Sequence, residues 1–143
     1  MKLLSEILYK TRIEEVIGST HTAISSITFD SRKVKKDTLF VATRGTATDG
    51  HKFIEIAIES GAAAIVCEEV PEVMRDNITY VKVTDSTHAL GFMACNYYDN
   101  PSQKLKLVGV TGTNCKTTTV TLLFNLFRTL GHNVGLLSTV QNK

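Results

Sequence analysis

The stretch Leu105-Lys-Leu-Val-Gly-Val-Thr-Gly-Thr-Asn-Cys-Lys-Thr-Thr-Thr119 is the most informative part of the sequence. Its apolar beginning, residues 105–110, predicts a buried strand, and the apolar pattern after Lys116 predicts a helix. A turn rich in glycine, threonine and asparagine lies between them. In a strand–turn–helix unit of this kind, backbone N–H groups and the helix N-terminus face a phosphate. The stretch therefore predicts an α/β fold with a nucleoside triphosphate site.

The candidate nucleotide contacts are consecutive along this turn. They are Gly112, Thr113, Asn114, Cys115, Lys116, Thr117 and Thr118. In such a loop the lysine ammonium reaches the terminal phosphates, and the hydroxyl of the following threonine can bind Mg²⁺. We therefore expect Lys116 to be the catalytic residue of the loop and Thr117 to be its metal ligand.

The turn departs from the usual phosphate-binding pattern at two positions. Cys115 stands directly before the lysine, where glycine is usual because it tolerates backbone angles that other residues avoid. Val110 stands where the strict pattern has its first glycine. The alternative is an ordinary strand–turn–helix corner with one basic residue. The register of Gly112, Lys116 and Thr117 favours the phosphate loop.

Composition limits the remaining possibilities. The 143 residues are 43% hydrophobic and 21% charged, with a net charge of +2, which is ordinary for a globular protein of one or two small domains. The basic cluster 32–36 indicates a solvated turn rather than a nucleic-acid site. No apolar run predicts a membrane span or a signal peptide, so we expect a cytoplasmic protein. Cys67 and Cys95 are expected to be small core residues.

The rest of the chain alternates helix and strand patterns. Helices are expected over 2–10, 51–60 and 84–98, and strands over 23–29, 38–42, 63–67 and 78–83. The polar, proline-containing segment 99–104 separates two patterned blocks, so we expect a first α/β domain over 1–100 and a second over 101–143. The second block predicts one helix, 116–130, with a core stripe ending at Leu130, and two strands, 105–110 and 133–138. A nucleotide-binding sheet normally has more strands, which indicates a truncated domain.

Several motifs of one family occur here in the family's order. Residues 109–119 resemble the ATP loop of the Mur ligases, which carry Gly-Thr-Asn-Gly-Lys-Thr-Thr. Segments 27–34, 37–42 and 45–53 resemble the first domain of that family, and segment 92–107 resembles its interdomain stretch. Together these segments span nearly the whole chain, and within the family they favour the MurE type.

The resemblance implies a cytoplasmic enzyme of peptidoglycan synthesis that uses ATP and Mg²⁺. ATP would phosphorylate a carboxylate of the UDP-N-acetylmuramoyl dipeptide L-Ala-D-Glu, and the amine of a third amino acid would attack the acyl phosphate. Lys116 would neutralise charge on the transferring phosphoryl group, and Thr117 would help to hold Mg²⁺.

The resemblance also implies a UDP-substrate-binding role for the first domain. Phe29 and Ser31 would line the uracil site, and Thr46, Ala47 and Thr48 would contact the UDP portion. The residues alone indicate less: a polar strand end beside a Gly/Thr/Asp loop can form a ligand rim, or two solvated turns.

Other features leave alternatives open. The chain can be an inactive ligase fragment, a non-catalytic UDP-binding module whose loop Cys115 has disabled, or part of a MurF-type ligase. Its truncated segment is expected to self-associate or to dock against the first domain. His51 is expected to have a surface or capping role at a helix start. The adjacent acids Glu68 and Glu69 are expected to be solvated, because neighbouring residues do not share a helical face.

Overall fold

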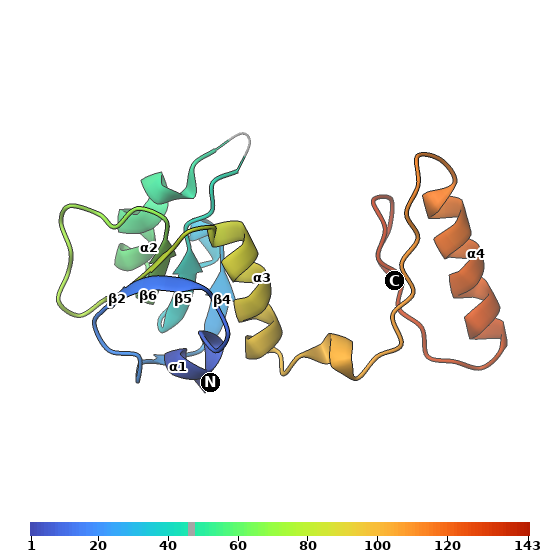
Figure 1. Ribbon diagram of the computed structural model, residues 1–143, viewed down its shortest axis with the longest axis horizontal. Helices are drawn as coiled ribbons and strands as arrows, with labels where there is room; N and C mark the ends of the chain where they lie inside the picture. Colours follow the sequence, from blue (N-terminus) through green and yellow to red (C-terminus); the bar gives the residue numbers. More distant parts are fainter. Residues whose placement is uncertain (46–47) are drawn as a thin grey trace. The chain divides into compact units, whose positions relative to one another are not determined.

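The computed structural model describes residues 1–45 and 48–143. These residues form two compact units, Met1–Lys104 and Leu105–Lys143 (Figure 1). The fold is α/β, as the sequence predicts, with a mainly parallel sheet in the first unit.

The sheet of the first unit has the strand order β2-β7-β6-β5-β4 among the described residues. Its strands are β2 (Ile13–Ile17), β4 (Ser26–Thr28), β5 (Thr38–Val41), β6 (Ala62–Cys67) and β7 (Thr79–Val83). Strands β4 to β7 are parallel, and β2 is antiparallel to β7. A separate antiparallel pair joins β1 (Lys2–Leu3) to β3 (Ala23–Ile24).

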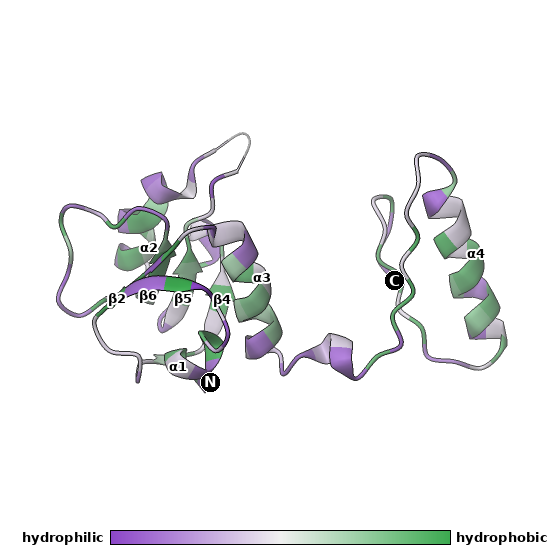
Figure 2. Ribbon diagram, viewed as in Figure 1, coloured by the Kyte–Doolittle hydropathy of each residue, from purple (hydrophilic) through white to green (hydrophobic). Residues whose placement is uncertain are grey.

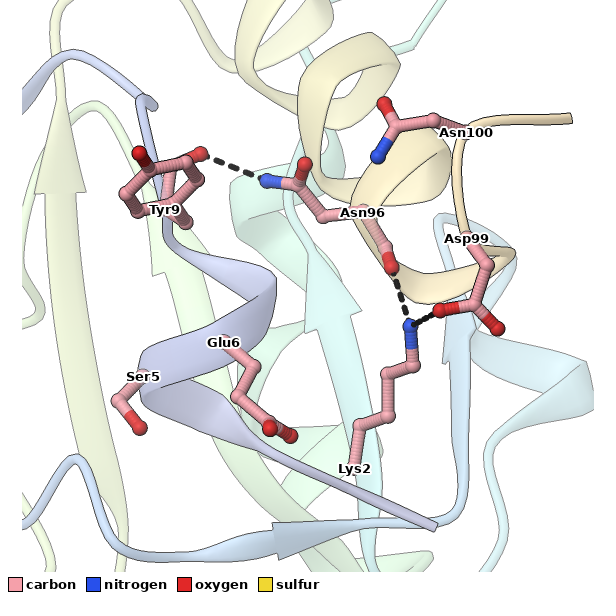
Figure 3. Close-up of a pocket in the computed structure, with 7 residues that line it drawn as sticks. All are labelled: Lys2, Ser5, Glu6, Tyr9, Asn96, Asp99 and Asn100. Carbon is pink, nitrogen blue, oxygen red and sulfur yellow. Dashed lines mark hydrogen bonds and ion pairs between the residues drawn. The ribbon is translucent and has the colours of Figure 1, made fainter. Parts of the chain in front are cut away.

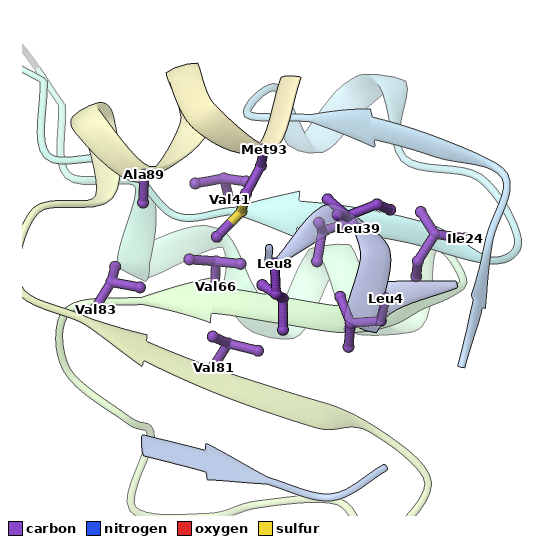
Figure 4. Packing of buried hydrophobic residues seen from close by; sticks show 12 residues of the cluster. Leu4, Leu8, Ile24, Leu39, Val41, Val66, Val81, Val83, Ala89 and Met93 are labelled. Atoms are coloured by element: carbon purple, nitrogen blue, oxygen red, sulfur yellow. The ribbon is translucent and has the colours of Figure 1, made fainter. Parts of the chain in front are cut away.

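Helices cover both faces of this sheet because its strands are apolar on both faces. On one face, α1 (Leu4–Ile7) and α3 (Ser86–Tyr97) pack against Leu39 and Val41 of β5 (Figure 4). On the other face, α2 (Ile54–Glu59) packs against Phe40 of the same strand. Alternate residues of β5 thus belong to two different cores.

Capping residues and short 3-10 helices set the ends of these elements. The Asp85 carboxylate accepts the His88 N–H at 2.8 Å and caps α3, as predicted. The 3-10 helices are η1 (Ser31–Lys33), η2 (Gly50–Phe53) and η3 (Pro101–Gln103). Gly61 follows α2 at a φ of 105°, which agrees with its predicted role as a helix stop.

Three predictions for the first unit need correction. The helix expected over 2–10 is one turn long, because Lys2 and Leu3 pair with β3. The strand expected over 23–29 divides into β3 and β4, which join different sheets. Cys95 is exposed rather than in the core, because it lies two residues beyond the buried Met93 and therefore on the opposite side of α3.

The second unit contains one regular element, α4 (Lys116–Thr129), among its described residues. The strands predicted over 105–110 and 133–138 are absent there, apart from an isolated bridge between Leu137 and Asn142. A strand needs a hydrogen-bonded partner, and these two runs form no ladder. The sequence pattern was therefore wrong about these two elements as this chain folds.

Apolar residues of α4 are only partly covered. Phe124 is buried, whereas Leu122, Leu126 and Leu130 are 64%, 52% and 62% exposed. The predicted core stripe therefore holds for Phe124 but not for Leu130. Figure 2 shows hydrophobic residues along this helix.

Candidate functional site

The predicted phosphate loop of the second unit leads directly into α4. Gly112 has a φ of 150°, and Cys115, the residue before the helix, has a φ of 62° and a ψ of 4°. The first backbone bond of the helix runs from the Thr119 N–H to the Cys115 oxygen at 2.9 Å. The N–H groups of residues 116–118 lie before that bond. The first N–H groups of a helix have no acceptor within the helix, so they can donate to an anion.

The Lys116 side chain folds back over this loop. Its ammonium donates to the Gly112 oxygen at 2.5 Å and to the Thr113 oxygen at 3.2 Å. Residues 111–116 are exposed, and Thr117 is partly buried. The loop thus presents backbone N–H groups, one ammonium and several hydroxyls. Residues 111–118 include no carboxylate side chain. Such a set of donors suits a phosphate, and a phosphate with the Thr117 hydroxyl suits Mg²⁺.

Cys115 has backbone angles that glycine was expected to be needed for. Its φ of 62° lies in the left-handed region, where a Cβ is strained. Its side chain makes no capping hydrogen bond to the helix. The residue therefore strains the loop without a compensating capping hydrogen bond from its own side chain.

A second group of candidate residues lies in the first unit, where β4 ends. Phe29 directly follows the strand and is 63% exposed, and Ser31 begins η1. Asp30, between them, accepts the Arg32 N–H at 3.1 Å and pairs with the Arg32 guanidinium at 2.9 Å. The guanidinium lowers the pKa of Asp30 to about 2. This turn is therefore a fixed structure that holds Phe29 and Ser31 on either side of an ionised carboxylate.

The loop after β5 carries the other predicted substrate contacts. Thr46 and Ala47 lie outside the described residues, and Thr48 is exposed. The Gly45 N–H donates to the Thr48 oxygen at 3.1 Å, and residues 44 and 49 form an isolated bridge. We call the described residues 44, 45, 48 and 49 the β5 loop. Because parallel strands end at one edge of a sheet, this loop and the Phe29–Ser31 turn belong to the same edge.

A charged cluster beside the β5 loop was not predicted. The Arg44 guanidinium pairs with Glu69 and lies 3.4 Å from the Glu68 carboxylate. Glu68 also accepts the N–H and hydroxyl of Ser86, at 3.0 and 2.8 Å. Burial would raise the pKa of Glu68, but these hydrogen bonds and the charge of Arg44 together lower it. The expectation of solvation holds for Glu69, with its side chain 76% exposed, and is wrong for Glu68, at 18%.

His51 joins the same cluster. Its Nε2 accepts the Glu68 N–H at 2.9 Å, and its Nδ1 lies 2.7 Å from the Asp49 carboxylate. The side chain is only 13% exposed. The sequence placed His51 at a helix start, which is correct, but it gave no sign of the partner seventeen residues away.

A hollow at the opposite end of α3 does not belong to this edge. It is lined by Lys2, Ser5, Glu6, Tyr9, Asn96, Asp99 and Asn100 (Figure 3). The Lys2 ammonium crosses it to reach the Asn96 oxygen at 2.6 Å and Asp99 at 2.5 Å. Ser86, beside the charged cluster, begins the same helix, and twelve residues of α-helix span about 18 Å.

The described residues lack two kinds of feature. Within residues 1–45 and 48–143, no three His, Cys, Asp or Glu side chains are grouped so as to hold a metal ion. No helix of the described chain combines the length and apolar character that a membrane crossing requires.

Comparison with known sequences gives consistent matches. Residues 23–98 match the model of the Mur ligase family, catalytic domain. The chain is 54% identical over 140 residues to a UDP-N-acetylmuramoyl-L-alanyl-D-glutamate–2,6-diaminopimelate ligase of Cytophaga hutchinsonii. It is 48% identical over 139 residues to the ligase of the same name from Phocaeicola vulgatus. Each alignment covers 97% of this chain but 29% of the relative, so the chain spans less than a third of these proteins.

Comparison with solved structures gives the same family of folds. A crystal structure of MurF from Acinetobacter baumannii matches with a TM-score of 0.68 at 25% identity, covering 90% of this chain and 28% of the other. MurF ligase from Thermotoga maritima in complex with ADP matches with a TM-score of 0.56 at 34% identity, covering 76% of this chain and 24% of the other.

Proposed function

Because the chain belongs to the Mur ligase family, we propose that it is the N-terminal part of a MurE-type ligase, which adds the third amino acid to UDP-N-acetylmuramoyl-L-Ala-D-Glu. The observation that carries this proposal is the 54% identity over 140 residues to a diaminopimelate ligase. The names of the relatives favour diaminopimelate as the added amino acid. The whole protein would act in the cytoplasm, in peptidoglycan synthesis.

We assign the two candidate groups to the two substrates. Residues 1–100 would form the UDP-substrate domain, with Phe29 and Ser31 at the uracil and residues 46–48 at the rest of the UDP. Residues 101–143 would begin the ATP-binding domain. The exposure of Phe29 and the fixed turn at Asp30 support the first assignment, because an exposed aromatic ring can stack on a base.

Residues 112–118 would bind ATP. The Lys116 ammonium would leave the Gly112 and Thr113 oxygens and contact the terminal phosphates. There it would stabilise the charge that develops while a substrate carboxylate becomes an acyl phosphate. Mg²⁺ would be held by the Thr117 hydroxyl and the phosphates. The chain alone, spanning 29% of its relatives, is expected to be inactive.

Separate titrations of the chain test these assignments. UDP-N-acetylmuramoyl-L-Ala-D-Glu should bind, and a Phe29→Ala variant should bind it less tightly. ATP with Mg²⁺ should bind weakly, because of the strained angle at Cys115. Failure of the UDP substrate to bind would refute the substrate-domain assignment.

Two alternatives follow from particular observations. The left-handed angle at Cys115 favours a UDP-binding module whose ATP loop this residue has disabled. ATP binding that is undetectable in the chain and appears in its Cys115→Gly variant would support this alternative. The fold match to MurF favours a ligase of that type. An assay of the whole protein with diaminopimelate and with D-Ala-D-Ala decides between MurE and MurF activity.

A further inference from the structure

We propose that His51 is a positioning residue for the UDP substrate, which fastens the β5 loop to the end of β6 through a neutral imidazole protonated at Nδ1. This inference rests on the proposed function, because it needs a ligand at that edge of the sheet. It concerns a residue for which the sequence predicted only a capping or surface role.

The hydrogen bonds of the imidazole determine its protonation pattern. Nε2 faces two donors, the N–H of Glu68 at 2.9 Å and that of Glu69 at 3.4 Å, so it must be the unprotonated acceptor. Nδ1 faces a carboxylate oxygen of Asp49 at 2.7 Å, so it carries the proton. A proton on Nε2 would oppose two N–H donors and break the contact. The arrangement therefore requires one tautomer of neutral histidine.

The imidazole connects two parts of the chain that are distant in sequence. Asp49, at the end of the β5 loop, accepts both the backbone N–H of His51 at 3.0 Å and its ring N–H. The other side of the ring contacts the backbone just after β6. Thr48, the described member of the candidate UDP contacts in this loop, directly precedes Asp49. Loss of the ring would therefore free the loop segment that carries Thr48.

The other side of the β5 loop is held by the same two residues. Arg44 pairs with the carboxylates of Glu68 and Glu69, whereas His51 contacts their backbone N–H groups. Gly50 makes a close approach possible here, since a Cβ on it would lie 2.7 Å from the Thr43 oxygen. The loop is thus attached to the end of β6 from both of its sides.

The two attachments differ in their exposure to solvent. The Arg44 side chain is 46% exposed and that of His51 is 13% exposed. Ion pairs in water contribute little, whereas an unsatisfied buried N–H is costly. The ring contacts the Asp49 carboxylate and the backbone N–H groups of Glu68 and Glu69, whose carboxylates pair with Arg44. We infer that His51, more than Arg44, determines where the loop lies.

Two matched substitutions separate positioning from general stability. In His51→Gln, the amide oxygen lies near the position of Nε2 and can still accept the Glu68 N–H. In His51→Asn, an amide N–H lies near Nδ1 and can contact Asp49, but no acceptor reaches Glu68. The exposed His21 provides the control substitution His21→Asn. All are made in the full chain and titrated with UDP, at a temperature well below the unfolding transition of each.

We expect the Asn variant to bind UDP about tenfold more weakly than the unchanged chain, and the Gln variant to bind within about threefold of it. Hydrogen exchange at the Glu68 amide should quicken in the Asn variant only. Nitrogen NMR of the imidazole should show the Nδ1–H tautomer. UDP binding by the Asn variant that equals that of the unchanged chain, or a ring protonated at Nε2, would overturn the proposal. If the unchanged chain fails to bind UDP, the proposed function fails first, and the positioning role falls with it.

Discussion

Cys115 has the backbone angle that glycine ordinarily has at this point of a phosphate loop. A side chain held at a left-handed φ of 62° costs on the order of 1–3 kcal/mol. The helix begins at Lys116, directly after this residue, and the Lys116 ammonium lies over the candidate loop. The residue thus limits the loop through its Cβ rather than through a missing donor.

Replacement of this residue by glycine should improve nucleotide binding. We expect Cys115→Gly to bind ATP with Mg²⁺ about tenfold to a hundredfold more tightly, since glycine can adjust its backbone angles to the bound phosphates and has no Cβ to keep them at a distance. The measurement is a calorimetric titration of the full chain. Cys115→Ala is the matched control, because it removes the thiol and keeps the Cβ. Equal improvement in both variants would show that the thiol, not the backbone angle, weakens binding.

The carboxylate of Asp30 tests the rigidity of the turn beside Phe29. Its hydrogen bonds to Arg32 hold its pKa at about 2, below its usual value of 3.8. A pKa lowered by folding means that the pair stabilises the folded state above pH 4 and loses this effect as the pH falls toward 2. In Arg32→Gln, the pKa of Asp30 should return toward 3.8, as measured by NMR titration. Lys33→Gln should change it much less, and an unchanged value in Arg32→Gln would contradict the pairing.

Among the elements, those with local signals were predictable from the sequence. Strands β5, β6 and β7 are short apolar runs, and α3 has Asp85 as its cap, so their positions agree with the prediction within a few residues. The edge strand β2 was missed, because Ile13-Glu-Glu-Val-Ile17 interrupts its apolar residues with two acids. The run 105–110, exposed except at Val110, has the strand pattern but forms no ladder. A sequence pattern does not show whether a strand has a partner.

The residues of the candidate site also differ in whether a local sequence signal indicates them. The candidate phosphate loop is contiguous in sequence, so one motif is enough to propose all of its residues. The cluster around His51 combines the ends of three elements, and Arg44, Glu68 and Ser86 carry no common sequence signal. Only the parallel arrangement of β5, β6 and β7 brings them together.

Ser86 joins the start of α3 to the end of β6. Its hydroxyl is fully buried and donates to the Glu68 carboxylate at 2.8 Å. We expect Ser86→Ala to reduce the free energy of unfolding by about 1–2 kcal/mol at pH 7, because a hydrogen bond to a charged group is lost. Thermal unfolding measures the change, with the exposed Thr87→Ala as control.

The effect of Ser86→Ala should also depend on pH. Because the pKa of Glu68 is lowered in the folded chain, its contribution is present at neutral pH and decreases in acid as the carboxylate is protonated. The difference between the unchanged chain and the variant should therefore become smaller as the pH falls below 4.5, the usual pKa of the group. A difference that stays constant with pH would exclude the ionised Glu68 as the partner.

For the whole molecule, the first unit contains two complete hydrophobic clusters on either side of its sheet. A protein shortened to residues 1–100 keeps every residue of both clusters, together with the Lys2–Asp99 ion pair at the end of α3. We expect it to show a cooperative thermal transition by circular dichroism. Residues 1–84 provide the contrast, since they lack α3 and its buried Met93. A shortened protein of 100 residues without a cooperative transition would place the domain boundary elsewhere.

The second unit should behave differently, because many of its apolar side chains face solvent. Leu107, Leu122 and Leu137 are 70%, 64% and 85% exposed, and exposed apolar surface drives association. We therefore expect the 143-residue chain to form larger species as its concentration rises, and the protein of residues 1–100 to remain monomeric under the same conditions. Sedimentation velocity over a hundredfold range of concentration compares the two. Replacement of Leu122 and Leu126 by glutamate, on the exposed side of α4, should reduce association in the full chain. A full-length chain that stays monomeric over the whole range would show that these side chains do not promote association.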